Sequence, residues 1–146
     1  MALIRGIVYP EHLYYDLYNQ IWYEPLPDGT VRAGFTPVAM QLLGDVLAFT
    51  PKRLGKPFLA GKSMATIEGG KWVGAAEAAF PGVVVASNEN LERRPKLLNE
   101  DAFGAGWMVI LRPAADNWRE TLLTGSQIGP AFEAWIAAED YKGKVE

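Results

Sequence analysis

The chain has 146 residues, a formal net charge of -3 and an apolar fraction of 49%, which suits one globular domain with its own core. It has no cysteine and one histidine, His12, so disulfides and thiolate nucleophiles are excluded and we expect no metal site. The acidic balance argues against nucleic acid as a partner. Since no apolar run reaches transmembrane length and the start lacks signal-peptide features, we expect a cytoplasmic protein without a membrane partner.

The first elements in chain order are a β-hairpin and a short helix. Residues 21–35 contain two apolar runs around Pro27-Asp28-Gly29, and Asp-Gly between such runs is a strong hairpin signal. Thr36 can cap a helix over residues 37–43, because its hydroxyl could accept a hydrogen bond from the first turn. Gly44 stands where a helix commonly ends.

Further strands and a helical tail follow. Turns rich in Gly and Pro separate strands that we expect over residues 45–49, 63–67, 83–85 and 106–111. The segment 88–99 predicts a turn and a short helix broken by Pro95. Apolar residues at helical spacing predict two helices in the tail, one presenting Trp118, Leu122 and Leu123 and the next presenting Phe132, Trp135 and Ile136. The result is a β-rich body with a helical C-terminal cover.

Several motifs resemble functional sites without meeting their requirements. Gly61-Lys62-Ser63 lacks the earlier glycine of a phosphate-binding loop at position 56, and no helix signal follows it. Gly104-Ala105-Gly106 opens a strand rather than a helix, so it fails as a dinucleotide motif. Nothing fixes a catalytic separation between Glu68 and Glu77. We interpret both as solvated strand residues.

The N-terminal region is rich in aromatic residues, with tyrosines at 9, 14, 15, 18 and 23 and a tryptophan at 22. A stacking surface for nucleic acid would need surrounding Lys and Arg side chains, which are scarce here. We therefore expect these rings to cover an edge of the β body or to form a partner surface.

The stretch IEGGKWVGAAEAAFPG, residues 67–82, places a lysine directly after two glycines. Gly69-Gly70 can adopt the positive φ angles of a tight hairpin turn, which would leave Lys71 at the hairpin tip. Lys71 is then either an ordinary solvated lysine or an amine displayed for chemistry.

The spacing of Glu68, Lys71 and Gly82 resembles that of lipoyl and biotinyl carrier domains. Residues 22–113 resemble the glycine cleavage system H protein family, above all in the closing run LLNEDAFGAGWMVILRP. The resemblance implies a mainly β, lipoyl-domain-like barrel-sandwich hybrid with short helices. It also implies one domain over 1–146, with a core at 22–113, an N-terminal extension at 1–21 and a C-terminal helical cover at 114–146.

The same resemblance implies a carrier protein that is not an enzyme. Its cofactor would be lipoate, attached to Lys71 as N6-lipoyllysine, and its first partners would be lipoate-attaching enzymes. Biotin is disfavoured because methionines do not flank Lys71. The resemblance implies cofactor-binding roles for Glu68, Gly70 and Trp72 as well, Glu68 in recognition by the attaching enzyme and Trp72 in docking or shielding the arm. Such carriers are expected to be monomers.

The tip departs from the family pattern, which has Ser-Val before the lysine and Ala-Ala-Ser-Asp after it. Gly69, Gly74 and Ala75 replace two serines and an aspartate, and Trp72 is added. This tip is more similar to that of lipoate-binding proteins of the heterodisulfide-reductase-like system. That similarity implies a shuttle for sulfur intermediates in oxidation of reduced sulfur compounds, with that complex and sulfur transferases as partners.

Two alternatives stay open. The first is a glycine cleavage H protein, carrying the aminomethyl group between a decarboxylase and an aminomethyltransferase. The second is a relative that carries no arm. For Lys71, Glu68 and Trp72 the ordinary structural explanations, a solvated charge or hairpin packing, stand beside these roles.

Overall fold

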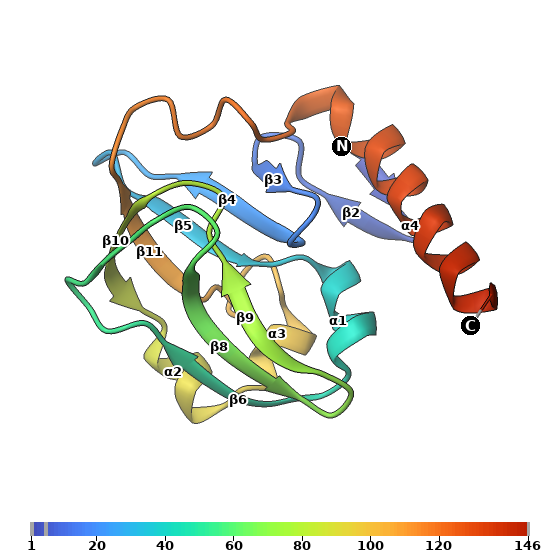
Figure 1. Cartoon of the computed structure of the whole chain (residues 1–146), viewed down its shortest axis with the longest axis horizontal. Helices are drawn as coiled ribbons and strands as arrows, with labels where there is room; N and C mark the ends of the chain where they lie inside the picture. The colour runs from blue at the N-terminus through green and yellow to red at the C-terminus, as the bar shows by residue number, and fades with distance from the viewer. Residues whose placement is uncertain (1, 5, 146) are drawn as a thin grey trace.

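The computed structural model describes residues 2–4 and 6–145 and shows two main antiparallel sheets, confirming the mainly β fold class (Figure 1). The six strands of the larger sheet, in spatial order, are β3 (Tyr14–Asp16), β4 (Ile21–Pro25), β5 (Val31–Phe35), β11 (Val109–Pro113), β10 (Gly82–Ser87) and β7 (Pro57–Phe58). The smaller sheet contains β6 (Val46–Pro51), β8 (Ser63–Gly69) and β9 (Val73–Glu77). β1 (Ala2–Ile4) and β2 (Ile7–Tyr9) form a separate hairpin.

The predicted hairpin and helix near residues 21–43 are confirmed. β4 and β5 pair across a turn in which Gly29 has a φ of 86°, and α1 spans Pro37–Leu43. Thr36 occupies the N-cap position of α1 as expected, but its side chain makes no hydrogen bond to the first turn. Its hydroxyl instead donates to the side-chain carbonyl oxygen of Gln20 at 2.6 Å.

The bounds of several other elements differ from those predicted from the sequence. β8 runs two residues beyond the predicted strand, to Gly69. The strand after the tip, β9, was implied by the predicted hairpin and by Glu77, but its bounds were not predicted, because Val-Gly-Ala-Ala-Glu has no apolar alternation. β11 begins at Val109, three residues later than expected. Two helices, α2 (Glu89–Arg93) and α3 (Leu97–Glu100), lie on either side of Pro95 as the sequence suggested.

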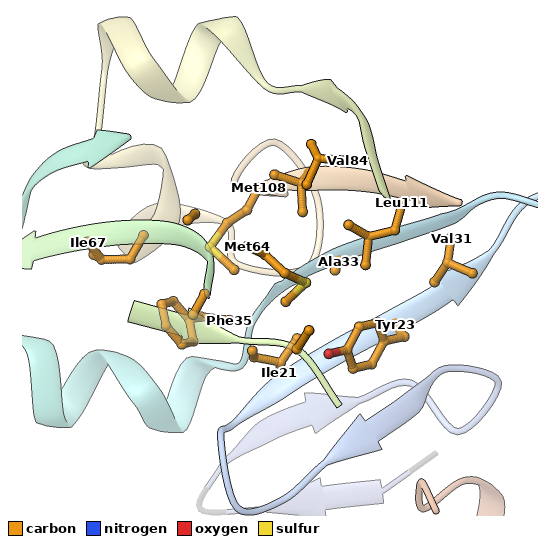
Figure 2. Packing of buried hydrophobic residues seen from close by; sticks show 14 of the residues in the cluster. Ile21, Tyr23, Val31, Ala33, Phe35, Met64, Ile67, Val84, Met108 and Leu111 are labelled. Atoms are coloured by element: carbon orange, nitrogen blue, oxygen red, sulfur yellow. The ribbon is translucent and has the colours of Figure 1, made fainter. Parts of the chain in front are cut away.

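The main core lies between the two sheets. Figure 2 shows side chains from β4 and β5, among them Ile21, Tyr23 and Phe35, pointing toward Met64 and Ile67 of β8. All are at most 5% exposed. Burial of apolar area is the main favourable contribution to folding, so this core fixes the smaller sheet on the larger one.

A second buried cluster joins the N-terminal region to the C-terminal helix. α4 (Ile128–Val145) buries Ile128, Phe132 and Ile136 against Tyr9, Tyr15 and Trp22. β3 pairs with β4, so the aromatic segment covers a sheet edge as expected. Figure 1 shows α4 running along β1 and β2 at one side of the molecule.

Only the second of the two predicted tail helices forms. Residues 114–124 are a run of turns. Trp118 and Leu122 are nevertheless buried in the main core, and Leu123 forms an isolated bridge with Tyr15. The apolar spacing therefore predicted the burial of Trp118 and Leu122 correctly, but residues 114–124 pack against the core as irregular turns rather than as a helix.

Candidate functional site

The β8–β9 hairpin ends in a two-residue turn that presents Lys71. The N–H of Gly69 donates to the carbonyl oxygen of Trp72 across 2.8 Å. Gly70 and Lys71 are therefore the central residues of the turn, and the side chain of Lys71 is exposed. In Figure 1 this tip projects from the smaller sheet beside α1.

The tip glycines serve a different purpose from the one expected. Neither Gly69 nor Gly70 has a positive φ, so the turn does not depend on the left-handed region. A Cβ at Gly69 would overlap the carbonyl oxygen of Leu43. Glycine at 69 therefore permits two backbones to approach closely, whereas a Cβ at Gly70 would meet nothing nearer than the carbonyl oxygen of Asp45, at 3.9 Å.

Two backbone hydrogen bonds fasten the tip to the loop after α1. The N–H of Gly70 donates to the carbonyl oxygen of Asp45 at 2.9 Å, and that of Lys71 donates to the carbonyl oxygen of Leu43 at 3.0 Å. The stem of Lys71 runs over Gly44, where a Cβ would lie 3.1 Å from the lysine Cγ. The root of the lysine is thus held by a second element while the rest of its side chain extends into solvent.

Glu68 and Trp72 lie on either side of the turn. Glu68 is exposed and pairs with Val73 in the strand register. The indole of Trp72 is 43% exposed, and its ring covers the position that a side chain at Gly74 would occupy. Trp72 is therefore partly packed on its own strand and partly open to solvent.

A cavity of about 480 Å³ lies next to the tip and includes Lys71 in its lining. Four aromatic residues from separate elements line it: Tyr18 from the β3–β4 turn, Phe35 from the end of β5, Trp72 from the hairpin and Trp135 from α4. Tyr18 is 85% exposed, so it stands at the mouth. The cavity offers an apolar chain attached to Lys71 a place out of water.

Polar groups line the same cavity. They are Asn19 and Gln20 from the β3–β4 turn and Glu77 from β9. Gln20 is held in place, because its side-chain amide donates to the carbonyl oxygen of Leu17 at 2.7 Å and its φ of 57° belongs to the left-handed region. A carboxylate and two amides can accept hydrogen bonds from a cationic amine.

Sequence reasoning missed Glu77, Tyr18 and Trp135 as site residues. The structure separates Glu77 from Glu68, since Glu77 pairs with Ser63 at the far end of β9. The two glutamates therefore do not form a catalytic pair. This agrees with our interpretation of them as separate strand residues. One signal in the sequence could have identified Glu77. The family aspartate is absent at Ala75, and Glu77 stands two residues later. Because residues two apart share one face of a strand, Glu77 can present a carboxylate on the same face.

Neither of the other sequence motifs contributes a residue to the cavity lining, although Ser63 pairs with Glu77 in the strand register. Gly61-Lys62-Ser63 leads into β8, and Gly104-Ala105-Gly106 lies in the turns before β11. Over residues 2–4 and 6–145, no group of three His, Cys, Asp or Glu residues could hold a metal ion. Among the helices of this described part, none is long and apolar enough to cross a membrane.

Comparison with known proteins gives one consistent family. The family model described as Glycine cleavage H-protein matches residues 13–134. The chain is 39% identical over 137 residues to glycine cleavage system H protein 2 of Aquifex aeolicus, covering 93% of this chain and 85% of that one. It is 34% identical over 132 residues to the probable glycine cleavage system H protein 2 of Sulfolobus acidocaldarius, covering 89% of each.

A solved structure agrees with these relatives. The crystal structure of a glycine cleavage system H protein from Mycobacterium marinum superposes with a TM-score of 0.71 at 31% identity, covering 82% of this chain and 94% of that one. The expected H-protein fold is therefore confirmed over most of the chain. The chain belongs to the glycine cleavage H-protein family, whose members are non-catalytic carriers of a covalently attached lipoyllysine.

Proposed function

We propose that this protein is the lipoyl carrier of a glycine cleavage system and that Lys71 is the residue that bears lipoate. The observation that carries this proposal is the position of Lys71. Its side chain is exposed at a turn clamped by two hydrogen bonds, and it lines a cavity of about 480 Å³. The family supplies the cofactor.

The residues present fit an amide-linked arm. Attachment joins the lysine Nζ to the carboxyl carbon of an activated lipoyl ester or adenylate. The activating group leaves, and the lysine ammonium loses two of its three protons because the amide nitrogen keeps one. The arm would extend on the order of 14 Å from the backbone, counting ordinary bond lengths. The clamp at Leu43 and Asp45 gives that arm a fixed origin.

Lipoate, when bound, would supply a disulfide that can accept a one-carbon amine group from glycine decarboxylation while it is reduced, and it would be left as the dithiol after that group is released. The cavity residues would then have separable roles. Tyr18, Trp72 and Trp135 offer aromatic surface for sulfur, a contact that proteins use favourably. Glu77 offers a carboxylate for the cationic amine. Trp72 would also reduce the access of water to the arm.

Two further tip residues have proposed roles. Glu68 is exposed three residues before Lys71, where an attaching enzyme could recognise it. Gly70 contributes its N–H to the clamp. The proposed partners are accordingly lipoate-attaching enzymes, the decarboxylase and the aminomethyltransferase. A monomeric, cytoplasmic carrier is part of the same proposal.

The glycine role is preferred to the sulfur role that the tip sequence suggested. The relatives reported above carry glycine cleavage in their names. The sulfur interpretation depended on lost polar groups at 69, 74 and 75, yet Glu77 and Gln20 line the cavity and can replace them. One feature still favours sulfur shuttling with a heterodisulfide-reductase-like complex. It is the packing of the Trp72 indole over Gly74 at the tip.

The test begins with intact mass and peptide mapping of protein from its native host. We expect one lipoyl group on Lys71, none in Lys71→Arg, and full modification in Lys62→Arg, which changes another exposed lysine. An unmodified Lys71 in native protein would refute the carrier proposal. Glycine decarboxylase with glycine should then load wild-type protein but not Lys71→Arg. A lipoylated protein that is not loaded would leave the sulfur role as the better explanation.

A further inference from the structure

Asn99 of α3 lies far from Lys71 in sequence but connects directly to the loop that holds the tip. Its Oδ1 accepts from the N–H of Val46 at 2.8 Å, and its Nδ2 donates to the carbonyl oxygen of Gly44 at 2.9 Å. The Val46 N–H requires an acceptor, so these bonds define which amide atom faces which group. We propose that Asn99 is a positioning residue for Lys71, an inference that rests on the proposed function.

The first step of the argument concerns one peptide unit. The carbonyl of Asp45 and the N–H of Val46 belong to the same planar trans peptide and point in opposite directions. Asn99 holds the N–H side. On the other side, the Asp45 oxygen accepts from Gly70. Asn99 therefore sets the plane, and hence the direction, of the carbonyl that binds the tip, and the aligned dipoles strengthen one another.

The second step concerns the peptide unit between Leu43 and Gly44, two units earlier in the chain. Its carbonyl oxygen accepts from the N–H of Lys71 at 3.0 Å, and its own N–H donates to Met40 at the end of α1, at 2.9 Å. The two tip amides are thus held by two peptides of one loop, and the Gly44–Asp45 peptide, whose carbonyl oxygen Asn99 binds, lies between them. The end of α1 anchors the first peptide, and Asn99 anchors the second.

The third step links this anchor to the lysine side chain. Gly44, whose carbonyl oxygen Asn99 holds, is also the residue over which the stem of Lys71 runs. A shift of Gly44 would therefore change the direction in which the stem leaves the backbone. Because Leu43 and Lys71 both line the cavity, the same shift would change how the arm enters it.

The experiment compares full-length lipoylated wild type with Asn99→Ala, Asn99→Asp and Asn88→Ala. Asn88 is a matched control, because its side chain caps α2 and donates to the carbonyl oxygens of Ala105 and Trp107, both at 2.8 Å. The main readout is hydrogen exchange of single backbone amides by NMR. The second readout is the rate of lipoyl transfer by a lipoate–protein ligase to the unmodified forms.

In Asn99→Ala we expect the amides of Gly70 and Lys71 to exchange about tenfold faster, because the loop that accepts from them loses both of its hydrogen bonds to Asn99. Lipoyl transfer should slow by a similar factor of about ten. Asn99→Asp still accepts from Val46, so protection of Gly70 should lie between the alanine variant and wild type. Asn88→Ala should accelerate exchange in α2 and leave the tip unchanged.

Unchanged tip exchange in Asn99→Ala would overturn the inference, as would equal acceleration at the tip in Asn88→Ala, since that would indicate general loosening. These outcomes are separable from the proposed function. If native Lys71 bears no lipoyl group, the proposed function fails whatever the exchange data show. If Lys71 is lipoylated and the tip amides do not respond, only the positioning role fails.

Discussion

The indole ring of Trp72 occupies the space above Gly74, two residues further along the same strand. A Cβ at Gly74 would overlap the ring atoms Cζ2 and Cη2. Two departures from the family tip, the added tryptophan and the lost serine, are therefore one structural unit. The tryptophan requires the glycine, and neither substitution is independent of the other.

This relationship predicts a strongly coupled pair of substitutions. Gly74→Ser alone should displace the indole and cost on the order of 1 kcal/mol of unfolding free energy, less than overpacking in a closed core, because the ring is partly exposed and can turn toward solvent. In Trp72→Ala/Gly74→Ser the serine has room, so at least half of that loss should be recovered. Urea denaturation of the four members of the cycle gives the coupling energy. Additive effects would show that the ring can move aside freely.

Gly69 and Gly70 provide a matched test of the clamp. Gly69→Ala should force the tip away from Leu43, because the new Cβ would overlap a backbone carbonyl oxygen. Gly70→Ala has ordinary contact distance, 3.9 Å, to Asp45. We expect lipoyl transfer to fall about tenfold in the first variant and by less than about twofold in the second. Similar rates in the two variants would refute a tight approach at Gly69.

The two glutamates of the hairpin should affect different steps. Glu77 lines the cavity, whereas Glu68 stands beside the exposed tip. Glu77→Gln should slow loading of the lipoylated protein by glycine decarboxylase about threefold to tenfold, because a charge-assisted hydrogen bond is lost, and leave lipoyl transfer unchanged. Glu68→Gln should show the reverse pattern. Rates measured for both steps in both variants check this, and an effect of Glu77→Gln on lipoyl transfer would contradict it.

Close packing of Gly34 against Trp22 should make that glycine irreplaceable. A Cβ at Gly34 would lie 2.7 Å from Cζ2 of the fully buried indole. The indole has little freedom to move, since its Nε1 donates to the carbonyl oxygen of Ala102 at 3.0 Å. Gly34→Ala should lower the unfolding free energy by about 1–3 kcal/mol, measured by urea denaturation. A change below about 0.5 kcal/mol would contradict this packing.

Alkaline pH should destabilise the protein through Tyr9. Burial raises the pKa of Tyr9 from 10.0 to about 12, although its hydrogen bond from the N–H of Val38 opposes the shift. The unfolded chain therefore loses this proton first. The stabilising contribution is complete below pH 10 and is lost between about pH 10 and 12.

Tyr9→Phe checks the assignment. At neutral pH the variant should be less stable by about 1 kcal/mol, because the Val38 N–H loses its acceptor. Between pH 10 and 12 its stability should fall less steeply than that of wild type. Burial also raises the pKa of Tyr15 and Tyr23, so part of the alkaline loss should remain. The unfolding free energy of both proteins is measured by denaturation at each pH. Parallel curves of unfolding free energy against pH would exclude Tyr9 as a source of the alkaline loss of stability.

Elements with local signals could be predicted closely, and those held by distant partners could not. The hairpin around Gly29 and the helix over 37–43 follow from turn chemistry and from Pro37 and Gly44, which act on their own neighbours. β9 has no such signal and forms because β8 offers it a pairing edge. The apolar residues of 114–124 have helical spacing, yet the segment forms turns instead of a helix, because Leu123 forms a β-bridge with Tyr15.

The candidate site divides in the same way. By itself the sequence determined the family, the exposed lysine directly after two glycines and the hairpin that displays it, because these depend on residue type and spacing along one stretch. Only the tertiary structure decided that Leu43 and Asp45 hold the tip, that Asn99 holds their loop, and that Tyr18, Glu77 and Trp135 share a cavity with Lys71. The physical reason is that hydrogen bonds and cavity walls join residues far apart in the chain, and their partners exist only after the two sheets have packed.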